Sequence, residues 1–137
     1  MDHPLQDARI LVAEDNVVLA LDLIDRLREA GAEVLGPAVT LAQTLALAKL
    51  PSIACAVLDV NLGRETVFPA AQVLRERGIS TIFHTAIGNQ DRLSQDWPDA
   101  QVLAKPASLE FLMRAILVAC CGIASCVIPA PDTRRGR

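Results

Sequence analysis

The sequence is poor in aromatic residues: phenylalanine, tryptophan and tyrosine make up 3% of its 137 residues, and tyrosine is missing altogether. Hydrophobic residues nevertheless reach 52%. The core must therefore be built from leucine, valine, isoleucine and alanine. A chain of this length and composition is expected to form one domain, which we place at residues 9–122, after an extension (1–8) and before a tail (123–137).

Strong charge and targeting signals are also missing. The net charge is -3, so nucleic acid is not expected as a partner. The first four residues contain no apolar signal segment, and the uncharged stretch 115–131 is short for a membrane span and is interrupted by Gly122. We therefore expect a cytoplasmic protein that does not bind membranes and is a monomer or a weak homodimer.

The four cysteines show no CxxC spacing. Cys55 lies in an apolar run, and Cys120, Cys121 and Cys126 lie in one apolar segment near the C-terminus. Reduced, buried thiols are expected here rather than a metal site or a disulfide framework.

Residues 53–58 form an uncharged apolar run that comes after Pro51 and Ser52 and ends at Asp59. Such a run is typical of a strand buried on both faces at the centre of a parallel sheet. In open α/β sheets, ligands bind at the carboxyl ends of the strands. A single aspartate there could also start a loop or cap a helix. The role of Asp59 therefore depends on which residues stand at the ends of the other strands.

Four more short apolar runs predict strands, at 9–13, 33–36, 79–85 and 101–104. Helical periodicity and capping residues predict helices at 17–30, 41–50, 66–77 and 109–121, with at most a short helix in the polar stretch 88–99. Pro37 is expected to end the second strand, and Thr40 and Ser108 to cap helices. One apolar face is expected on the first helix: Val17, Leu21, Ile24, Leu27 and Ala30. Five alternations of strand and helix imply a doubly wound parallel α/β sheet with right-handed crossovers.

Polar residues stand at the ends of four of these strands: Glu14 and Asp15, Asp59, Thr85, and Lys105. In a parallel sheet these positions share one edge. Three carboxylates placed together repel one another unless a cation neutralises them, and Mg²⁺ prefers such hard oxygen ligands. With an ammonium and a hydroxyl beside them, they predict a site for phosphoryl transfer to Asp59.

These residues, in their order along the chain, resemble the five-part signature of response-regulator receiver domains of the CheY-like superfamily: Glu14-Asp15, Asp59, Thr85 and Lys105-Pro106. The resemblance extends from residue 9 to about residue 121. It implies a flavodoxin-like (βα)5 fold with strand order 2-1-3-4-5. It also implies that Asp59 accepts a phosphoryl group from a histidine kinase or a phosphotransfer protein.

The resemblance also implies a Mg²⁺ site. Asp15, Asp59 and the backbone carbonyl of Asn61 would bind the ion, and Glu14 would reach it through water. Without the resemblance, Asp15 or Asn16 could equally be the N-cap of the first helix.

Thr85 and Lys105 would contact the phosphoryl group, again by resemblance. The Lys105–Pro106 peptide bond is expected to be cis, whereas the base rate for such bonds favours trans. Receivers commonly carry an aromatic residue three positions before the lysine, which moves together with the threonine on activation. This chain has Val102 there, so a switch must use other residues.

A subgroup of single-domain receivers is similar at one further motif. It has a Phe-Ala-Thr-Gly core, lacks the aromatic switch and often works with histidine kinases of the HWE type. Phe83 and Thr85 match this core, whereas His84 and Ala86 do not. For His84, a packed imidazole is expected rather than a phosphohistidine or a metal ligand. Trp97 is expected to be a local packing anchor.

Three functions remain in competition. The first is a stand-alone receiver that signals through a protein partner or acts as a phosphate sink for a kinase. Such a receiver catalyses only its own phosphorylation and dephosphorylation. The second is a pseudo-receiver that binds partners without phosphorylation, which Val102 favours. The third is an aspartyl-nucleophile phosphatase, since residues 59–62 resemble the DxD motif of haloacid-dehalogenase-like enzymes, although Asn61 replaces the second acid.

Overall fold

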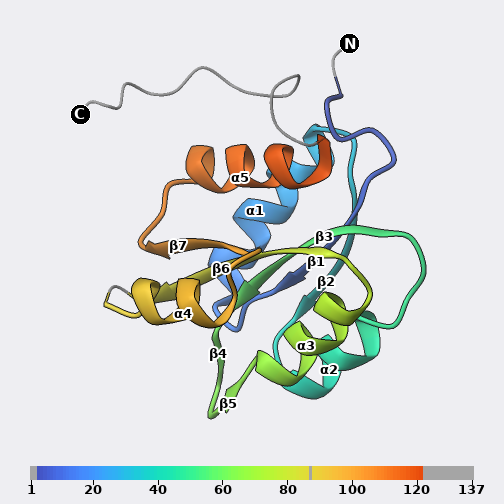
Figure 1. Ribbon diagram of the computed structural model, residues 1–137. Coiled ribbons are helices and arrows are strands. Elements are labelled where there is room, and N and C mark those ends of the chain that lie inside the picture. Colours follow the sequence, from blue (N-terminus) through green and yellow to red (C-terminus); the bar gives the residue numbers. More distant parts are fainter. Residues whose placement is uncertain (1–2, 87, 122–137) are drawn as a thin grey trace.

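The computed structural model describes residues 3–86 and 88–121. Its main sheet has five parallel strands in the order β2-β1-β3-β6-β7 (Figure 1). These strands are β1 (Arg9–Ala13), β2 (Glu33–Ala38), β3 (Ile53–Asp59), β6 (Ser80–Ala86) and β7 (Gln101–Lys105). Numbered among themselves, they have the order 2-1-3-4-5, so the predicted flavodoxin-like topology is confirmed.

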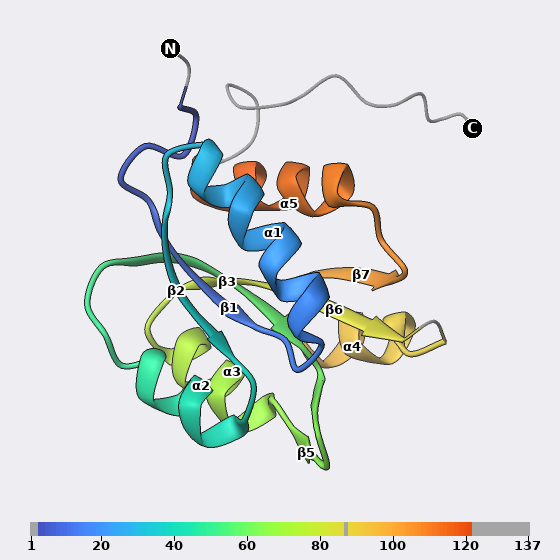
Figure 2. The same ribbon diagram turned by 180° about the vertical axis from the view of Figure 1, so that it is seen from behind.

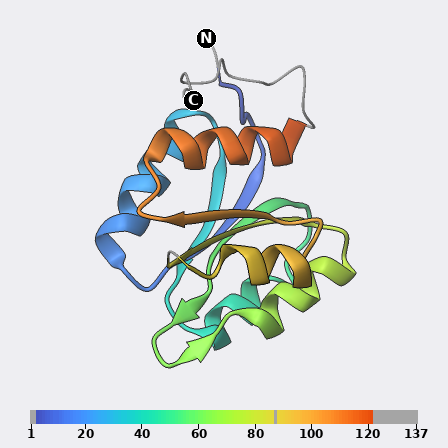
Figure 3. The ribbon, with the colours of Figure 1, turned by 60° about the vertical axis from the view of Figure 1, so that its left-hand side comes forward.

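Helices cover both faces of this sheet (Figures 2 and 3). They are α1 (Val17–Glu29), α2 (Leu41–Leu47), α3 (Phe68–Glu76), α4 (Gln90–Asp96) and α5 (Leu109–Cys121). Helices α1 and α5 lie on one face, and α2, α3 and α4 on the other. Side chains alternate along each strand, so β1 sends Ile10 and Val12 to the first layer and Leu11 to the second. Both layers are largely aliphatic, as the composition predicted.

The predicted apolar face of α1 is confirmed at Ile24, Leu27 and Ala30 but is wrong at Val17 and Leu21. Val17 and Leu21 are 50% and 49% exposed. The buried residues of the helix are Ala20, Leu23, Ile24 and Leu27. Because apolar residues occupy two overlapping stripes at helical spacing, periodicity alone cannot choose the stripe that meets the sheet. As a result the first turns of α1 present apolar side chains to solvent.

Strand β2 does not stop at Pro37 as predicted, but continues to Ala38. Proline is tolerated because β2 is an edge strand, where a backbone donor can be spared. The Gly36–Pro37 peptide bond is cis, and Gly36 has a φ of +123°. A Cβ atom on Gly36 would lie 2.5 Å from the carbonyl oxygen of Val12, so glycine is required for this close approach.

A small hairpin comes after β3 and was not predicted. Strands β4 (Asn61–Leu62) and β5 (Glu65–Thr66) pair in antiparallel fashion, with Asn61 opposite Thr66. Helix α3 therefore begins at Phe68 rather than at residue 66. Helix α2 is also shorter than predicted, ending at Leu47. The predicted caps of α2 and α5 are confirmed, because Thr40 accepts from the backbone N–H of Gln43 and Ser108 from that of Phe111.

The polar stretch before β7 does form a short helix, α4, and Trp97 comes directly after it. The Trp97 ring stacks on Phe68, with 5.9 Å between the ring centroids, and meets Phe83 edge-on at 5.4 Å. The Arg75 guanidinium lies 3.9 Å from the centre of the same ring. The prediction that Trp97 is a packing anchor is confirmed, since these rings join α3, β6 and α4.

At the N-terminal side, Leu5 is buried in the α1/α5 layer, and its N–H donates to the Ala30 carbonyl. At the other end, Gly122, the apolar tail and Cys126 lie outside the described residues. None of the helices in the described part of the chain is long and apolar enough to cross a membrane.

Candidate functional site

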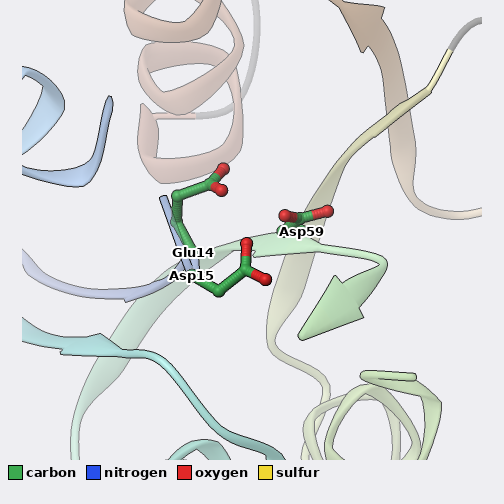
Figure 4. Close-up of side chains that lie close together, drawn as sticks. All are labelled: Glu14, Asp15 and Asp59. Carbon is green, nitrogen blue, oxygen red and sulfur yellow. The ribbon is translucent and has the colours of Figure 1, made fainter. Parts of the chain in front are cut away.

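Three carboxylates meet at the carboxyl edge of the sheet. Glu14 and Asp15 come directly after β1, and Asp59 is the last residue of the neighbouring strand β3. One oxygen of each carboxylate lies within 4.8 Å of the others, and all three side chains point toward a common space (Figure 4). Glu14 and Asp59 are buried, whereas Asp15 is exposed.

Local backbone contacts hold two of these carboxylates. The N-cap of α1 is Asn16, whose side chain accepts from the Leu19 N–H, so Asp15 is not the cap. Asp15 instead accepts a hydrogen bond of 2.9 Å from the backbone N–H of Gly63, between β4 and β5. Glu14 accepts a bond of 3.1 Å from the Asn16 N–H. The choice between Asp15 and Asn16, which the sequence left open, is thereby resolved.

Lys105, at the end of β7, reaches across this edge. Its Nζ lies 3.0 Å from Oδ2 of Asp59 and 3.3 Å from Oε1 of Glu14. Partial burial opposes the charged ammonium, but the hydrogen bond to Asp59 and the charges of both carboxylates outweigh it and raise the pKa of Lys105. The lysine therefore remains a fixed positive charge at neutral pH.

The Glu14 carboxyl is affected mainly by its burial. Burial raises its pKa to about 7; the hydrogen bond from Asn16 opposes this, and the charge of Asp59 adds to it. Burial outweighs the Asn16 hydrogen bond and the charge of Lys105, so Glu14 holds a proton more readily than an ordinary glutamate. This oxygen-only donor set, with one acid raised in pKa by burial, fits a hard divalent cation such as Mg²⁺.

Two further predicted residues lie at the same edge. The backbone N–H of Asn61 donates to Oδ1 of Asp59 over 3.2 Å. Thr85 is fully buried, and its hydroxyl oxygen has no hydrogen-bond partner among the described residues. In the β3–β6 ladder His84 is opposite Asp59, so Thr85 lies one residue further along the same edge. The Lys105–Pro106 peptide bond is cis.

His84 lies beside two of the carboxylates, because it lines a small hollow together with Glu14 and Asp59. His84 is buried, and it also lines a second hollow with Leu19, Ala86, Lys105, Pro106 and Ala107. Its Nε2 has no partner in the described part of the chain, and burial together with the charge of Lys105 lowers its pKa. Val102 is half-buried and pairs with Phe83, which places an aliphatic side chain at the position where many receivers carry an aromatic one.

Sequence reasoning missed the backbone donors of the site. The Gly63 N–H reaches Asp15 because the hairpin turns there, with a φ of +65° at Gly63. The available signal was a glycine between two short polar stretches, which is typical of a tight turn. The Asn16 N–H reaches Glu14 because the first helix begins immediately after the acidic pair.

Comparisons with known proteins agree with this geometry. No family model matches the sequence. The chain is 32% identical, over 128 residues, to the transcriptional regulatory protein PdtaR of Mycobacterium tuberculosis, covering 87% of this chain. It spans only 62% of the length of PdtaR.

Solved structures resemble the whole described domain. The non-phosphorylated receiver domain of HemR from Leptospira biflexa has a TM-score of 0.74 and 26% identity, covering 84% of this chain and 95% of that one. SdrG from Sphingomonas melonis has a TM-score of 0.69 and 32% identity, with coverages of 82% and 96%. A response regulator receiver protein from Sinorhizobium medicae shares the fold, with a TM-score of 0.73 and 24% identity, covering 84% and 95%.

The sheet order, the acidic cluster beside Lys105 and these similarities agree with one another. The chain belongs to the response-regulator receiver domains of the CheY-like superfamily.

Proposed function

We propose that this chain is the phosphoacceptor of a two-component phosphorelay, and that Asp59 accepts the phosphoryl group. The observation that carries the proposal is the setting of the Asp59 carboxylate. It is buried at a strand end, with Oδ2 held by Lys105 at 3.0 Å and Oδ1 by the Asn61 N–H at 3.2 Å. A carboxylate oriented in this way, beside two other acids, is suited to nucleophilic attack on phosphorus.

The donor would be the phosphohistidine of a histidine kinase or a phosphotransfer protein. An oxygen of Asp59 forms the new O–P bond while the N–P bond breaks, and the electron pair returns to the imidazole of the donor. The chain is itself the phosphoryl acceptor, so it turns over no separate substrate. The phosphorylated form would then act through contacts with a partner protein, or the chain would drain phosphoryl groups from its kinase. We expect this exchange in the cytoplasm.

The acidic cluster would hold Mg²⁺. Asp15 and Asp59 supply carboxylate oxygens, the Asn61 carbonyl is the third proposed ligand, and Glu14 would interact through water. When bound, the ion offsets negative charge on the transferring phosphoryl oxygens.

Two other side chains are placed to bind the phosphoryl group. Lys105 already pairs with Asp59, and its raised pKa keeps it charged. Its ammonium can therefore form an ion pair with the negatively charged oxygens of the phosphoryl group once this is attached to Asp59. The Thr85 hydroxyl is buried without a partner in the described structure, so it is free to donate to a phosphoryl oxygen. A buried hydroxyl without a partner costs about 1–3 kcal/mol, which such a bond would recover.

The direct test uses acetyl phosphate with Mg²⁺ and measures intact mass. Wild type is expected to gain one phosphoryl group, and Asp59→Asn to gain none. Asp25→Asn, an exposed carboxylate on α1 outside the cluster, is the matched control and should behave as wild type. A phosphoryl gain in Asp59→Asn would contradict the proposal. So would a wild type that is inert toward both acetyl phosphate and phosphorylated kinases, which would favour the phosphorylation-independent pseudo-receiver.

The kinase would dock on the first turns of α1. We define the α1 patch as Val17, Val18 and Leu21, which are 50%, 72% and 49% exposed. It begins two residues after the acidic pair, beyond the cap Asn16, and lies on the same helix as Leu19, which lines the hollow beside Lys105. An apolar helical surface of a donor protein could therefore pack on the patch while its phosphohistidine faces Asp59.

Val18→Glu tests this docking surface. It should slow phosphotransfer from phosphorylated histidine kinases of the source genome, with HWE-type kinases tried first, and leave phosphorylation by acetyl phosphate unchanged. Ala46→Glu is the matched control, because Ala46 is an exposed residue of α2 on the opposite face of the sheet. Equal loss with both phosphodonors would show that the substitution damages the site rather than the docking.

A further inference from the structure

Two thiols far apart in the sequence meet inside the α1/α5 layer. Cys55 lies in β3 and Cys120 in the last turn of α5, and their Sγ atoms are 3.6 Å apart although the two residues are 65 positions apart in sequence. Both are free thiols. Cys55 is fully buried, whereas Cys120 is half-buried at the edge of the same apolar cluster.

We propose that Cys55 and Cys120 form a reversible intramolecular disulfide when the protein meets a hydroperoxide. A disulfide requires about 2.05 Å between the sulfurs, so the pair must close by about 1.5 Å. The last turn of a helix can supply such a displacement more readily than the central strand of a sheet. The site lies outside the phosphoacceptor machinery and does not depend on it.

The chemistry balances with hydroperoxide as the oxidant. The Cys120 thiolate attacks one peroxide oxygen, the O–O bond breaks, and a sulfenic acid forms on Cys120 as water or an alcohol leaves. The Cys55 sulfur then attacks the sulfenic sulfur, and water leaves as the S–S bond forms. The two thiols together lose two electrons and two protons, and the peroxide is reduced.

Cys120 is expected to react with peroxide before Cys55, because the two thiols lie in different environments. In the reduced pair the Cys120 thiol donates to the Cys55 sulfur. Once Cys120 ionises, the Cys55 thiol can donate to the thiolate instead, which lowers the pKa of Cys120, although its partial burial opposes the effect. The same bond, together with burial, raises the pKa of Cys55. The half-buried thiol is therefore the one that peroxide reaches and the one that ionises first, while the buried thiol resolves it.

The disulfide would fasten the last turn of α5 to the central strand. Apolar packing and the thiol contact join these two elements in the reduced protein. Cys55 and Cys120 are 65 positions apart in sequence, so a bond between them would restrict the conformations of the unfolded chain. The melting temperature of the oxidised form is therefore expected to be about 10 °C higher than that of the reduced form.

The test uses the full chain with Cys121→Ser and Cys126→Ser, which leaves only the proposed pair. After treatment with hydrogen peroxide under native conditions, both thiols should resist alkylation. The intact mass should fall by two hydrogens, the chain should not be linked to a second copy, and dithiothreitol should restore both thiols. Adding Cys120→Ser should abolish the mass loss, whereas adding Asp59→Asn should leave it unchanged.

Three results of the alkylation and mass measurements would overturn the proposal. The first is that both thiols remain open to alkylation after peroxide treatment. The second is that Cys120 is oxidised to sulfinic or sulfonic acid while Cys55 stays reduced. The third is that the disulfide links two chains. Cys120→Ser changes a half-buried helix end and so is less disruptive than a change at the buried Cys55. Thermal unfolding of the same sample gives an independent measurement, and an unchanged melting temperature after oxidation would also overturn the proposal.

Discussion

Replacing Glu14 by glutamine should stabilise the metal-free protein at alkaline pH. The pKa of Glu14 is raised to about 7 by burial in the folded protein, against 4.5 for an ordinary glutamate. Between these two pH values the folded chain binds more protons than the unfolded chain, so stability falls as pH rises through this window. The contribution is fully present below pH 4.5 and is lost as pH rises through about 7. Glutamine cannot ionise and therefore avoids this loss.

The size of the effect can be worked out from the two pKa values. Each unit of pKa difference corresponds to about 1.4 kcal/mol of unfolding free energy, so the difference between the two states corresponds to at most about 3–4 kcal/mol. Solvent screens part of this, because the neighbouring Lys105 and Asp15 both reach the surface, so we expect about 1–2 kcal/mol. The amide oxygen of glutamine can still accept from the Asn16 N–H and from Lys105. The melting temperature should rise by about 5 °C at pH 8.

The assay is thermal unfolding followed by circular dichroism, in EDTA, between pH 5 and 8. Glu14→Gln and wild type should have similar melting temperatures near pH 5 and separate progressively toward pH 8. Glu65→Gln, which removes an exposed carboxylate in the β4–β5 hairpin, is the control and should parallel wild type at every pH. A Glu14→Gln protein that is less stable than wild type at pH 8, or that differs by a constant amount across the range, would refute the reasoning.

Three further predictions concern the site and the fold. Mg²⁺ affinity should increase as pH rises through about 7, because Glu14 must lose its proton, and calorimetric titration should show this in wild type but not in Glu14→Gln. Thr85→Val should raise the stability of the unphosphorylated protein by about 1 kcal/mol in urea, because a methyl group replaces a buried hydroxyl without a partner; a less stable variant would contradict this. Gly36→Ala should cost more than about 2 kcal/mol in urea, because its Cβ would meet the Val12 carbonyl at 2.5 Å. Gly78→Ala, also at positive φ but in open space, should cost only about 1–2 kcal/mol, so equal losses would argue against the close contact.

The convergence of the carboxylates could be predicted from the sequence because it depends only on topology. Once Asp59 and the acidic pair Glu14-Asp15 are placed at the ends of parallel strands, they must meet at one edge, whatever the side-chain detail. Hydrophobic runs located those strands well, since a buried parallel strand is nearly continuous in apolar residues. The strand order came from the family resemblance rather than from the residues alone.

Features decided by packing were harder to predict. The apolar residues of α1 offered two overlapping stripes, and only contact with the sheet selected Ala20 and Leu23 over Val17 and Leu21. The β4–β5 hairpin has strands too short to show an alternating pattern. The continuation of β2 through Pro37 depends on its position at the sheet edge, which is a property of the assembled fold.

The aromatic cluster has a practical consequence for observing the protein at work. Phe83 and Thr85 are two residues apart in β6, so their side chains lie on the same face of the sheet, and the Trp97 ring rests against Phe83. Trp97 is the single tryptophan of the chain, and there is no tyrosine. Its fluorescence therefore comes from one defined place, close to the threonine proposed to bind the phosphoryl group. The protein carries its own optical reporter, and a change in emission can be monitored in real time without a label.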